Sequence, residues 1–181
     1  MPINNIKVQL LPDNRLIVWD IVQANNLYNN GFYGRPLGVS KPKEGFDEPL
    51  ILDPVEGLYL TEKGNITVYE NGEIVPPKQL FQKFKTKYHL FSKKYKVYQD
   101  LRNKGFVITP GIKYGCEFAV YKKGPGIDHA PYIVQIQDKD EKISAAEIVK
   151  AGRLATTVRK SFILAVVNND IKYIEFDWWR A

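Results

Sequence analysis

The apolar run SFILAVVN at residues 161–168 constrains the fold of this chain more than any other segment. Strands that are buried on both faces are continuously apolar, so the run predicts a central strand covered on two sides. The preceding residues 144–160 begin with Ser144 and Glu147 three positions apart, a capping box that predicts a helix. After the run, NND predicts a turn and residues 171–179 a last strand. This succession predicts a sheet with a helix packed on it.

More strands and helices are expected before this helix. Residues 114–123 alternate between apolar and polar side chains and residues 130–137 are strand-like, which together predict a hairpin across KGPGID. Residues 106–111 predict a further short strand that ends in a turn. Two helices are expected over residues 78–87 and 92–104, the second with Ser92 as N-cap and Gly105 after its end.

The first part of the chain is rich in short strand signals and turns. Residues 6–11 and 15–21 flank the turn-forming PDN, as in a hairpin. Residues 25–54 are rich in Asn, Gly and Pro and predict a long loop, with at most a brief strand or helical turn inside it. Residues 57–75 predict short strands around KGN and ENG turns. Loops as long as the one expected at residues 25–54 are often functional.

These segments predict a mixed α/β (α+β) fold in two small domains. The expected limits are residues 1–84 for a strand-rich N-terminal α/β domain and 85–181 for a C-terminal domain with a mixed sheet flanked by helices. The length of 181 residues suits such an arrangement, and the 44% apolar content is enough for a core.

Composition limits the possible classes of function. The net charge of +6 permits nucleic acid as a partner without requiring it. With Cys116 as the single cysteine, neither a disulfide framework nor a cysteine-based zinc site can form within the chain. We find no signal-peptide pattern and no apolar stretch long enough to span a membrane, so a cytoplasmic protein without membrane attachment is expected.

Three side chains are candidates for a catalytic site. Tyr121 ends one hairpin strand and His129 precedes the next, so the loop between them need not separate them in space. Lys160 lies where the predicted helix meets the central strand, which brings it to the same edge if this strand neighbours the hairpin. Taken singly, each residue has an ordinary structural explanation, so the hypothesis depends on the combination.

The combination suits cleavage of RNA by its own 2′-hydroxyl group. This reaction needs a base for the 2′ proton, an acid for the departing 5′ oxygen and a cation for the phosphorane, and it needs no metal. Histidine exchanges protons most readily near neutral pH, so His129 is the natural acid. A tyrosine with an ordinary pKa near 10 is a poor base unless neighbouring cations depress this pKa, which Lys160 is suited to do.

Two other functions remain open at this stage. A metal-dependent nuclease of the restriction-endonuclease type needs carboxylates on adjoining strands beside a lysine, and its nearest match is Asp140-Glu141-Lys142. A non-catalytic RNA-binding subunit would use the same basic surface. Cleavage that persists in EDTA separates the first alternative from the metal-free reaction, and intact Tyr121, His129 and Lys160 argue against the second.

The motifs around these residues resemble those of a known family. KYGCEFAVYKKGPGIDHAPYIV, AGRLATTVRKSFILAVV and YIEFDWWRA are similar to the archaeal tRNA-splicing endonucleases, the tRNA-intron lyases, across residues 105–181. The resemblance implies a C-terminal nuclease domain, with Tyr121 as general base, His129 as general acid and Lys160 as the group that stabilises the phosphorane. It further implies cleavage at bulge-helix-bulge junctions of precursor tRNA, products with 2′,3′-cyclic phosphate and 5′-hydroxyl ends, and no cofactor.

The resemblance also implies contacts with RNA and with other subunits. Arg153 and Arg180 correspond to arginines that grip a bulged base, and we expect Lys41 and Lys43 in the long loop to contact RNA. Family members assemble as dimers or tetramers through the C-terminal strand and an acidic loop, whose place is taken here by residues 137–144. Because the charges of this loop alternate, a heterotetramer with a structural subunit is as well supported as a homodimer or homotetramer.

Overall fold

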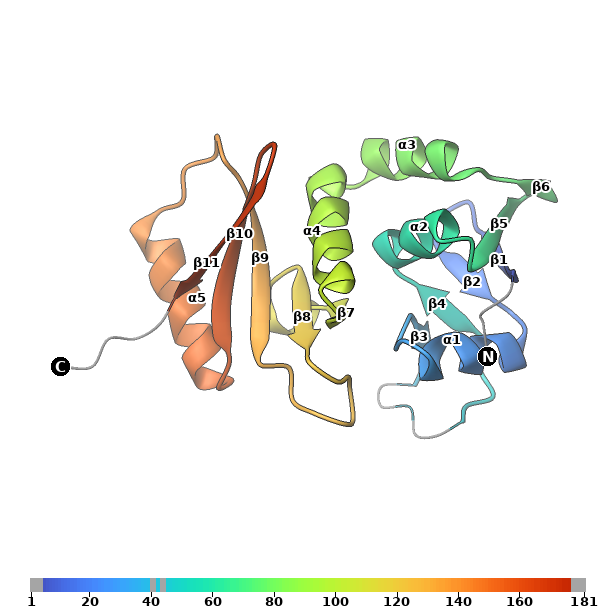
Figure 1. Ribbon diagram of the computed structural model, residues 1–181, viewed down its shortest axis with the longest axis horizontal. Helices are drawn as coiled ribbons and strands as arrows, with labels where there is room; N and C mark the ends of the chain where they lie inside the picture. Colours follow the sequence, from blue (N-terminus) through green and yellow to red (C-terminus); the bar gives the residue numbers. More distant parts are fainter. Residues whose placement is uncertain (1–4, 40–41, 43–44, 177–181) are drawn as a thin grey trace. The chain divides into compact units, whose positions relative to one another are not determined.

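The computed structural model describes residues 5–39, 42 and 45–176 (Figure 1). The chain divides into two compact units, Met1–Ser92 and Lys93–Ala181, each with a sheet of its own. Both units combine a mixed sheet with helices, which confirms the expected fold class. The expected domain limit between residues 84 and 85 lies within a helix and stays a prediction. No helix among the described residues is long and apolar enough to cross a membrane.

The N-terminal unit is built around a six-stranded sheet in the order β3-β4-β2-β1-β5-β6. Strand β1 is antiparallel to β2 and parallel to β5, so the sheet is mixed. The strands in its described part are β1 (Ile6–Leu10), β2 (Leu16–Val18), β3 (Arg35–Pro36), β4 (Leu50–Leu52), β5 (Ile66–Glu70) and β6 (Glu73–Ile74). The helices there are α1 (Ile21–Asn29), α2 (Pro54–Glu62) and α3 (Pro77–Lys87).

Helix α1 corrects the expectation of a strand followed by a loop. The expected strand over residues 15–21 is confined to β2, and α1 then covers residues that were assigned to the strand and the loop. The Asp20 side chain caps the helix by accepting a hydrogen bond of 2.9 Å from the backbone amide of Gln23. Ala24 and Leu27, three positions apart, are buried and fix the inner face.

Helix α2 replaces the first strand expected within residues 57–75. Asp53 and Glu56 form a capping box, and Pro54 occupies the start of the helix, where its missing amide hydrogen costs nothing. Residues 55–60 are all buried, so the helix has no exposed face to give a helical period in the sequence. The start signals were present, but the apolar pattern resembled that of a strand.

The C-terminal unit contains a five-stranded sheet in the order β11-β10-β9-β8-β7. Its strands are β7 (Val107–Pro110), β8 (Phe118–Tyr121), β9 (Tyr132–Asp138), β10 (Ser161–Val167) and β11 (Ile171–Phe176). A short 3-10 turn, η1 (Ile112–Tyr114), precedes β8. Helices α4 (Phe91–Asn103) and α5 (Ala145–Thr157) lie on opposite sides of the sheet (Figure 1). The central strand expected at residues 161–168 is β10, which is paired on both edges.

The two helices that flank this sheet largely follow the sequence prediction. The capping box of Ser144 and Glu147 is present at the start of α5. In α4, the apolar stripe points into the protein, with Tyr98 and Leu101 buried. One detail differs, because α4 begins at Phe91 and Ser92 therefore lies in its first turn rather than at its N-cap.

Candidate active site

One edge of the C-terminal sheet collects all three catalytic candidates. Strand β8 ends at Tyr121 and runs antiparallel to β9, so the end of β8 lies beside the start of β9 at Tyr132. Strand β10 runs parallel to β9, with Ser161 paired to Tyr132, so both begin at this same edge. His129 and Lys160 come shortly before these two strand starts. The strand topology therefore brings the three backbone positions to one edge.

The loop between Tyr121 and His129 is organised by Asp128. Its carboxylate accepts hydrogen bonds from the backbone amides of Lys122, Lys123 and Gly124, at 3.2, 3.1 and 2.8 Å. Burial acts to raise the pKa of Asp128, but these hydrogen bonds outweigh it and hold the pKa below its ordinary value. Sequence reasoning missed this role, although an aspartate that follows a Gly-Pro-Gly turn is suited to bind turn amides.

The C-terminus of α5 delivers Lys160 to the edge through a Schellman motif. The amide of Arg159 donates to the carbonyl of Thr156 at 3.1 Å, and the amide of Lys160 donates to the carbonyl of Ala155 at 2.9 Å. Arg159 has a φ of 54°, the left-handed conformation that this motif requires and glycine usually supplies. The chain thus turns sharply from α5 into β10 at this residue.

The Lys160 side chain reaches the segment that carries His129. Its Nζ donates a hydrogen bond of 2.5 Å to the carbonyl oxygen of Ala130, the residue after His129. The Lys160 side chain is half-buried, whereas His129 is exposed and Tyr121 is half-buried. The ammonium group and the loop with the imidazole are therefore held together at the start of β9.

Two residues that sequence reasoning missed lie beside these groups. Lys160 Nζ is 5.3 Å from the centre of the Tyr114 ring, and Lys113 Nζ is 4.8 Å from the same centre. The pKa of Lys113 is raised above its ordinary value, chiefly by hydrogen bonding with the Tyr114 side chain. Burial opposes this rise, and electrostatic interactions with Tyr114 and Tyr121 add to it. The Tyr114 ring therefore contacts two cations, and Lys113 also interacts with Tyr121. The sequence signal, a lysine and a tyrosine in a short turn, was too ordinary to identify them.

This arrangement is suited to an anionic substrate. Two ammonium groups, two phenols and an imidazole belong to the same edge, and ammonium groups bind phosphate oxygens through charge and hydrogen bonds. Imidazole exchanges protons near neutral pH, so the site contains groups for both charge stabilisation and proton transfer.

Comparison with known proteins identifies the family. The family model for the tRNA intron endonuclease catalytic C-terminal domain matches residues 91–173, and the model for the N-terminal domain of the same enzymes matches residues 9–81. The chain belongs to the tRNA intron endonuclease family. The resemblance seen in the sequence is confirmed, and the chain is an endonuclease.

Similarity to individual members of this family extends over almost the whole chain. The tRNA-splicing endonuclease of Saccharolobus solfataricus is 44% identical over 175 residues, which cover 93% of this chain and 96% of the relative. That of Sulfurisphaera tokodaii is 43% identical over 175 residues, covering 94% and 97%. That of Hyperthermus butylicus is 44% identical over 169 residues, covering 91% and 93%.

The residues expected to contact RNA are only partly described. Arg153 is exposed on α5, seven residues before Lys160. Within the described part of the chain, its guanidinium forms no hydrogen bond or ion pair with the three catalytic candidates. Arg180, Lys41 and Lys43 lie outside the described residues.

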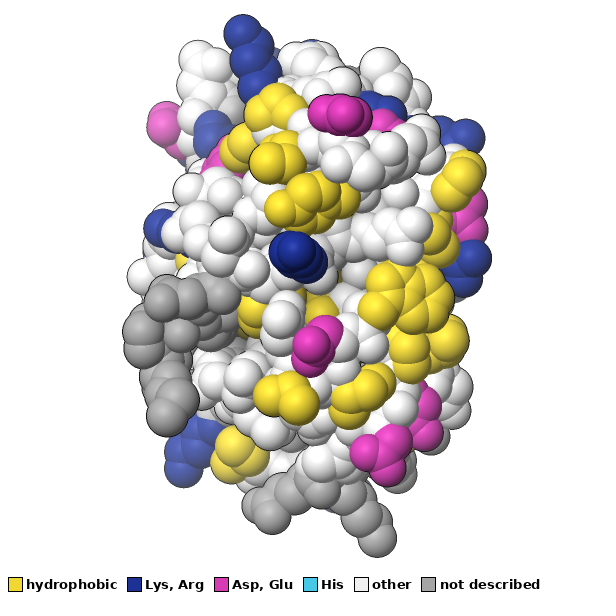
Figure 2. All heavy atoms as spheres, turned by 90° about the vertical axis from the view of Figure 1, so that its right-hand side faces the viewer, with side chains coloured by type: hydrophobic (Ala, Val, Ile, Leu, Met, Phe, Trp, Pro, Cys, Tyr) yellow, Lys and Arg dark blue, Asp and Glu magenta, His cyan; other side chains and the backbone are white. Residues whose placement is uncertain are grey.

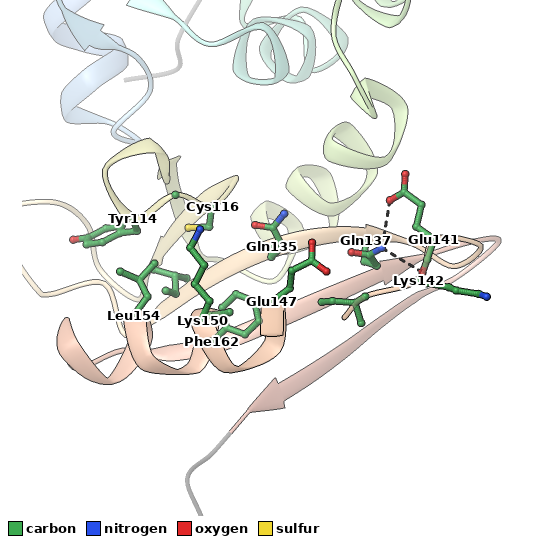
Figure 3. A pocket seen from close by; sticks show the side chains of 14 residues that line it. Tyr114, Cys116, Gln135, Gln137, Glu141, Lys142, Glu147, Lys150, Leu154 and Phe162 are labelled. Carbon is green, nitrogen blue, oxygen red and sulfur yellow. Dashed lines mark hydrogen bonds between the residues drawn. The ribbon is translucent and has the colours of Figure 1, made fainter. Parts of the chain in front are cut away.

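A cavity of about 430 Å³ lies between α5 and the sheet, with Tyr114 in its wall (Figure 3). Ile133, Leu154 and Phe162 form apolar parts of the wall, while Glu147 and Lys150 supply charge. Tyr114 therefore belongs both to this cavity and to the cation cluster.

Cys116 also lines this cavity. Burial, followed by the charge of Glu117, raises the pKa of the Cys116 thiol to about 11. The thiol is therefore protonated at neutral pH and a poor nucleophile there.

The residues of the metal-dependent alternative lie in the turn between β9 and α5. Asp140 and Glu141 are both exposed there, and the Glu141 carboxylate accepts a hydrogen bond of 3.3 Å from Gln137. Among the residues that the structure describes, no group of three or more His, Cys, Asp or Glu side chains is placed to hold a metal ion.

Proposed function

We propose that this chain is a tRNA-splicing endonuclease that cuts precursor tRNA at bulge-helix-bulge junctions without a metal ion. Family membership and the names of its relatives support the activity and the class of substrate. The observation that supports the mechanism is the hydrogen bond from Lys160 to the carbonyl of Ala130, which holds a cation beside the backbone of the residue that follows His129. A scissile phosphate bound at this ammonium group would lie close to an acid.

The proposed reaction is an internal transfer to the 2′ oxygen. The phenolate form of Tyr121 accepts the 2′-hydroxyl proton while the 2′ oxygen attacks phosphorus, and the bond from phosphorus to the 5′ oxygen breaks. His129 gives its proton to the departing 5′ oxygen, and the Lys160 ammonium balances the charge of the phosphorane. The products are a 2′,3′-cyclic phosphate and a 5′-hydroxyl.

Incubation with an intron-containing precursor tRNA, with and without EDTA, tests this proposal. We expect the same cleavage rate in both samples, and end-group analysis should find cyclic phosphate and 5′-hydroxyl ends. Loss of cleavage in EDTA, with recovery on addition of Mg²⁺, would support the metal-dependent alternative.

Single substitutions test the assigned roles. His129→Ala and Lys160→Ala should each slow cleavage by about 10²-fold or more, because each removes a group used in the transition state. His89→Ala is the matched control, since His89 is the other histidine of the chain. Unchanged cleavage in His129→Ala would show that the acid was assigned wrongly.

The contacts with RNA beyond the triad belong to the same proposal. Arg153 and Arg180, supplied by different subunits, hold a bulged base between their guanidinium planes, and Lys41 and Lys43 extend the bound RNA surface. Replacing both lysines by alanine should weaken cleavage of some bulge geometries more than others. Unchanged cleavage on every geometry tested would refute the role of the lysines.

Assembly is proposed to use β11 and the loop at residues 137–144. The Asp138 carboxylate of this loop is paired with Lys93 in the same chain, so part of the negative charge of the loop is already neutralised. This pairing favours a heterotetramer with a structural subunit over self-assembly through an acidic loop. Native mass spectrometry of the purified chain, alone and with such a subunit, would distinguish the two assemblies.

A further inference from the structure

The N-terminal unit has a groove that the proposed reaction does not use. Strand β1 alternates, so Lys7 and Gln9 are exposed on one face while Ile6, Val8 and Leu10 are buried on the other. Figure 2 shows the side of the molecule on which β1, β5 and β6 lie, with hydrophobic side chains gathered around a cationic one. A cavity of about 370 Å³ opens on the exposed face of β1.

Two aromatic side chains line this groove. Trp19, which follows β2, is 53% exposed, although large aromatic residues are usually mostly buried. Its indole Nε1 donates a hydrogen bond of 2.6 Å to Oε1 of Gln9, which holds the ring in place. Tyr69 is paired with Gln9 in the parallel register of β1 and β5, so it lies on the same face. The groove therefore contains an exposed, oriented ring and a second aromatic residue close by.

The polar groups of the groove are mainly donors. Oε1 of Gln9 accepts a hydrogen bond from the Trp19 indole. Oε1 of Gln23 accepts one from the backbone amide of Lys7. Each glutamine therefore presents its NH₂ group as the part that remains to bind a ligand. Lys7 adds an ammonium group, while the Asp20 carboxylate is engaged in capping α1.

Donors beside aromatic rings match an unpaired nucleotide. The rings offer faces on which a base stacks, the amides donate to base carbonyl and ring nitrogen acceptors, and the lysine binds a phosphate oxygen. The core of a protein interface is depleted of charged residues, whereas Lys7 lines this groove. We propose that the groove binds an unpaired nucleotide of an RNA substrate, with its base against Trp19 and Tyr69. This inference rests on RNA being the substrate, as proposed above, but it does not rest on the catalytic triad.

Binding of a single-stranded RNA tests the inference without any cleavage. The probe is a fluorescein-labelled 12-nucleotide RNA of mixed sequence, titrated with the full chain and followed by fluorescence anisotropy. Trp19→Ala combined with Tyr69→Ala should weaken binding about tenfold or more, because stacking on two aromatic residues is lost. A duplex of the same sequence should compete poorly, since its bases are already stacked.

The control is Val22→Ala. Val22 is an exposed hydrophobic residue of the same unit, at 73%, and it does not line the groove. Binding by this control should stay within about twofold of the unchanged chain, because surface substitutions away from a binding site have small effects. Trp19→Phe should retain most of the affinity, since it keeps a ring for stacking.

Crosslinking gives a second readout that does not depend on the variants folding. An RNA of the same length with 5-iodouridine should crosslink to peptides that contain Trp19 or Tyr69. Equal RNA affinity in the double alanine variant, or crosslinks found only in the C-terminal unit, would overturn the inference. A lower sedimentation coefficient in the double alanine variant, at unchanged RNA affinity, would show that the groove holds a second copy of the chain. That result would overturn the inference as well. Because cleavage is not measured, failure of the catalytic assignment would leave this test intact.

Discussion

Replacing Tyr114 by alanine should slow cleavage although Tyr114 is not one of the three expected catalytic residues. Its ring centre is 5.3 Å from Lys160 Nζ, within the range of a cation–π contact. Such contacts contribute about 0.5–1 kcal/mol at exposed sites and about 2 kcal/mol when desolvated, and Lys160 is half-buried. A loss of about 1–2 kcal/mol in holding the ammonium group corresponds to a rate about 5- to 30-fold lower.

The assay is single-turnover cleavage of a precursor tRNA with enzyme in excess, so that product release does not affect the rate. Tyr114→Phe is the matched control, because it keeps the ring beside Lys160 and removes only the phenolic oxygen that interacts with Lys113. We expect the rate of this variant to stay within about threefold of the unchanged chain, since one exposed hydrogen bond contributes about 0.5 kcal/mol or somewhat more. Circular dichroism melting curves should show both variants folded at the assay temperature.

Two results would refute this reasoning. If Tyr114→Ala cleaves at the unchanged rate, the ring does not position Lys160. If Tyr114→Phe is as slow as Tyr114→Ala, the phenolic oxygen and Lys113 are responsible instead of the ring. A Lys160→Arg variant helps to separate these cases, because guanidinium also stacks on an aromatic ring but has a different shape.

Three further predictions concern the surroundings of the site. Arg159→Gly should raise the free energy of unfolding by up to about 1 kcal/mol, measured by urea denaturation. A left-handed residue with a Cβ costs roughly 1–2 kcal/mol, and the greater backbone entropy of glycine in the unfolded chain offsets part of the gain from removing this strain. An unchanged or lower urea midpoint would contradict the prediction. Asp128→Ala should slow cleavage about fivefold by freeing the loop before His129, with Asp128→Asn in between. Because the pKa of Asp128 is lowered by folding, its contribution to stability should be complete above about pH 4 and be lost only in more acidic solution, so the cost of Asp128→Ala should not vary between pH 5 and 8. Cys116, with its thiol pKa raised to about 11, should react with iodoacetamide at pH 8 much more slowly in the folded chain than in urea, and equal rates would contradict the burial of this thiol.

Local signals explain why much of the fold was predictable. The capping box of Ser144 and Glu147, and the stripe of buried residues in α4, are set by side chains within one or two turns of each other. The apolar run of β10 likewise reflects a sheet with a helix on each face. Each of these patterns depends on short stretches of sequence, so no knowledge of the tertiary structure was required.

Helix α2 was not predictable in the same way, because its apolar pattern is set by contacts distant in the sequence. A Cβ on Gly57 would meet the side chain of Leu16 at 2.0 Å, so the helix packs directly against β2. With residues 55–60 buried on every side, the polar face that identifies an amphipathic helix is missing. The capping box of Asp53 and Glu56 and the proline at residue 54 were the local signals, and both mark only the start of the helix.

The additional residues of the candidate site escaped prediction for a related reason. Tyr114 meets Lys160 from a turn 46 positions earlier in the chain, and a single 3-10 turn has no periodicity that marks its inner face. Asp128 acts on amides four to six residues before it, which is a local contact. Its three hydrogen bonds depend on the φ values of Gly124 and Gly126, 140° and 85°, and a sequence does not reveal them.

The strand order explains why three residues far apart in sequence can serve one site. In the hairpin of β8 and β9, the second strand starts at the edge of the sheet where the first strand ends. In the parallel crossover from β9 through α5 to β10, the second strand starts at the edge where the first strand starts. Tyr121, His129 and Lys160 occupy these turning points, so their meeting depends on topology rather than on spacing. The hydrogen bond from Lys160 to Ala130 then fixes the end of the loop nearest His129, while Asp128 fixes the other end. The residues on either side of His129 are thus both anchored, which holds its backbone beside the segment that Lys160 binds.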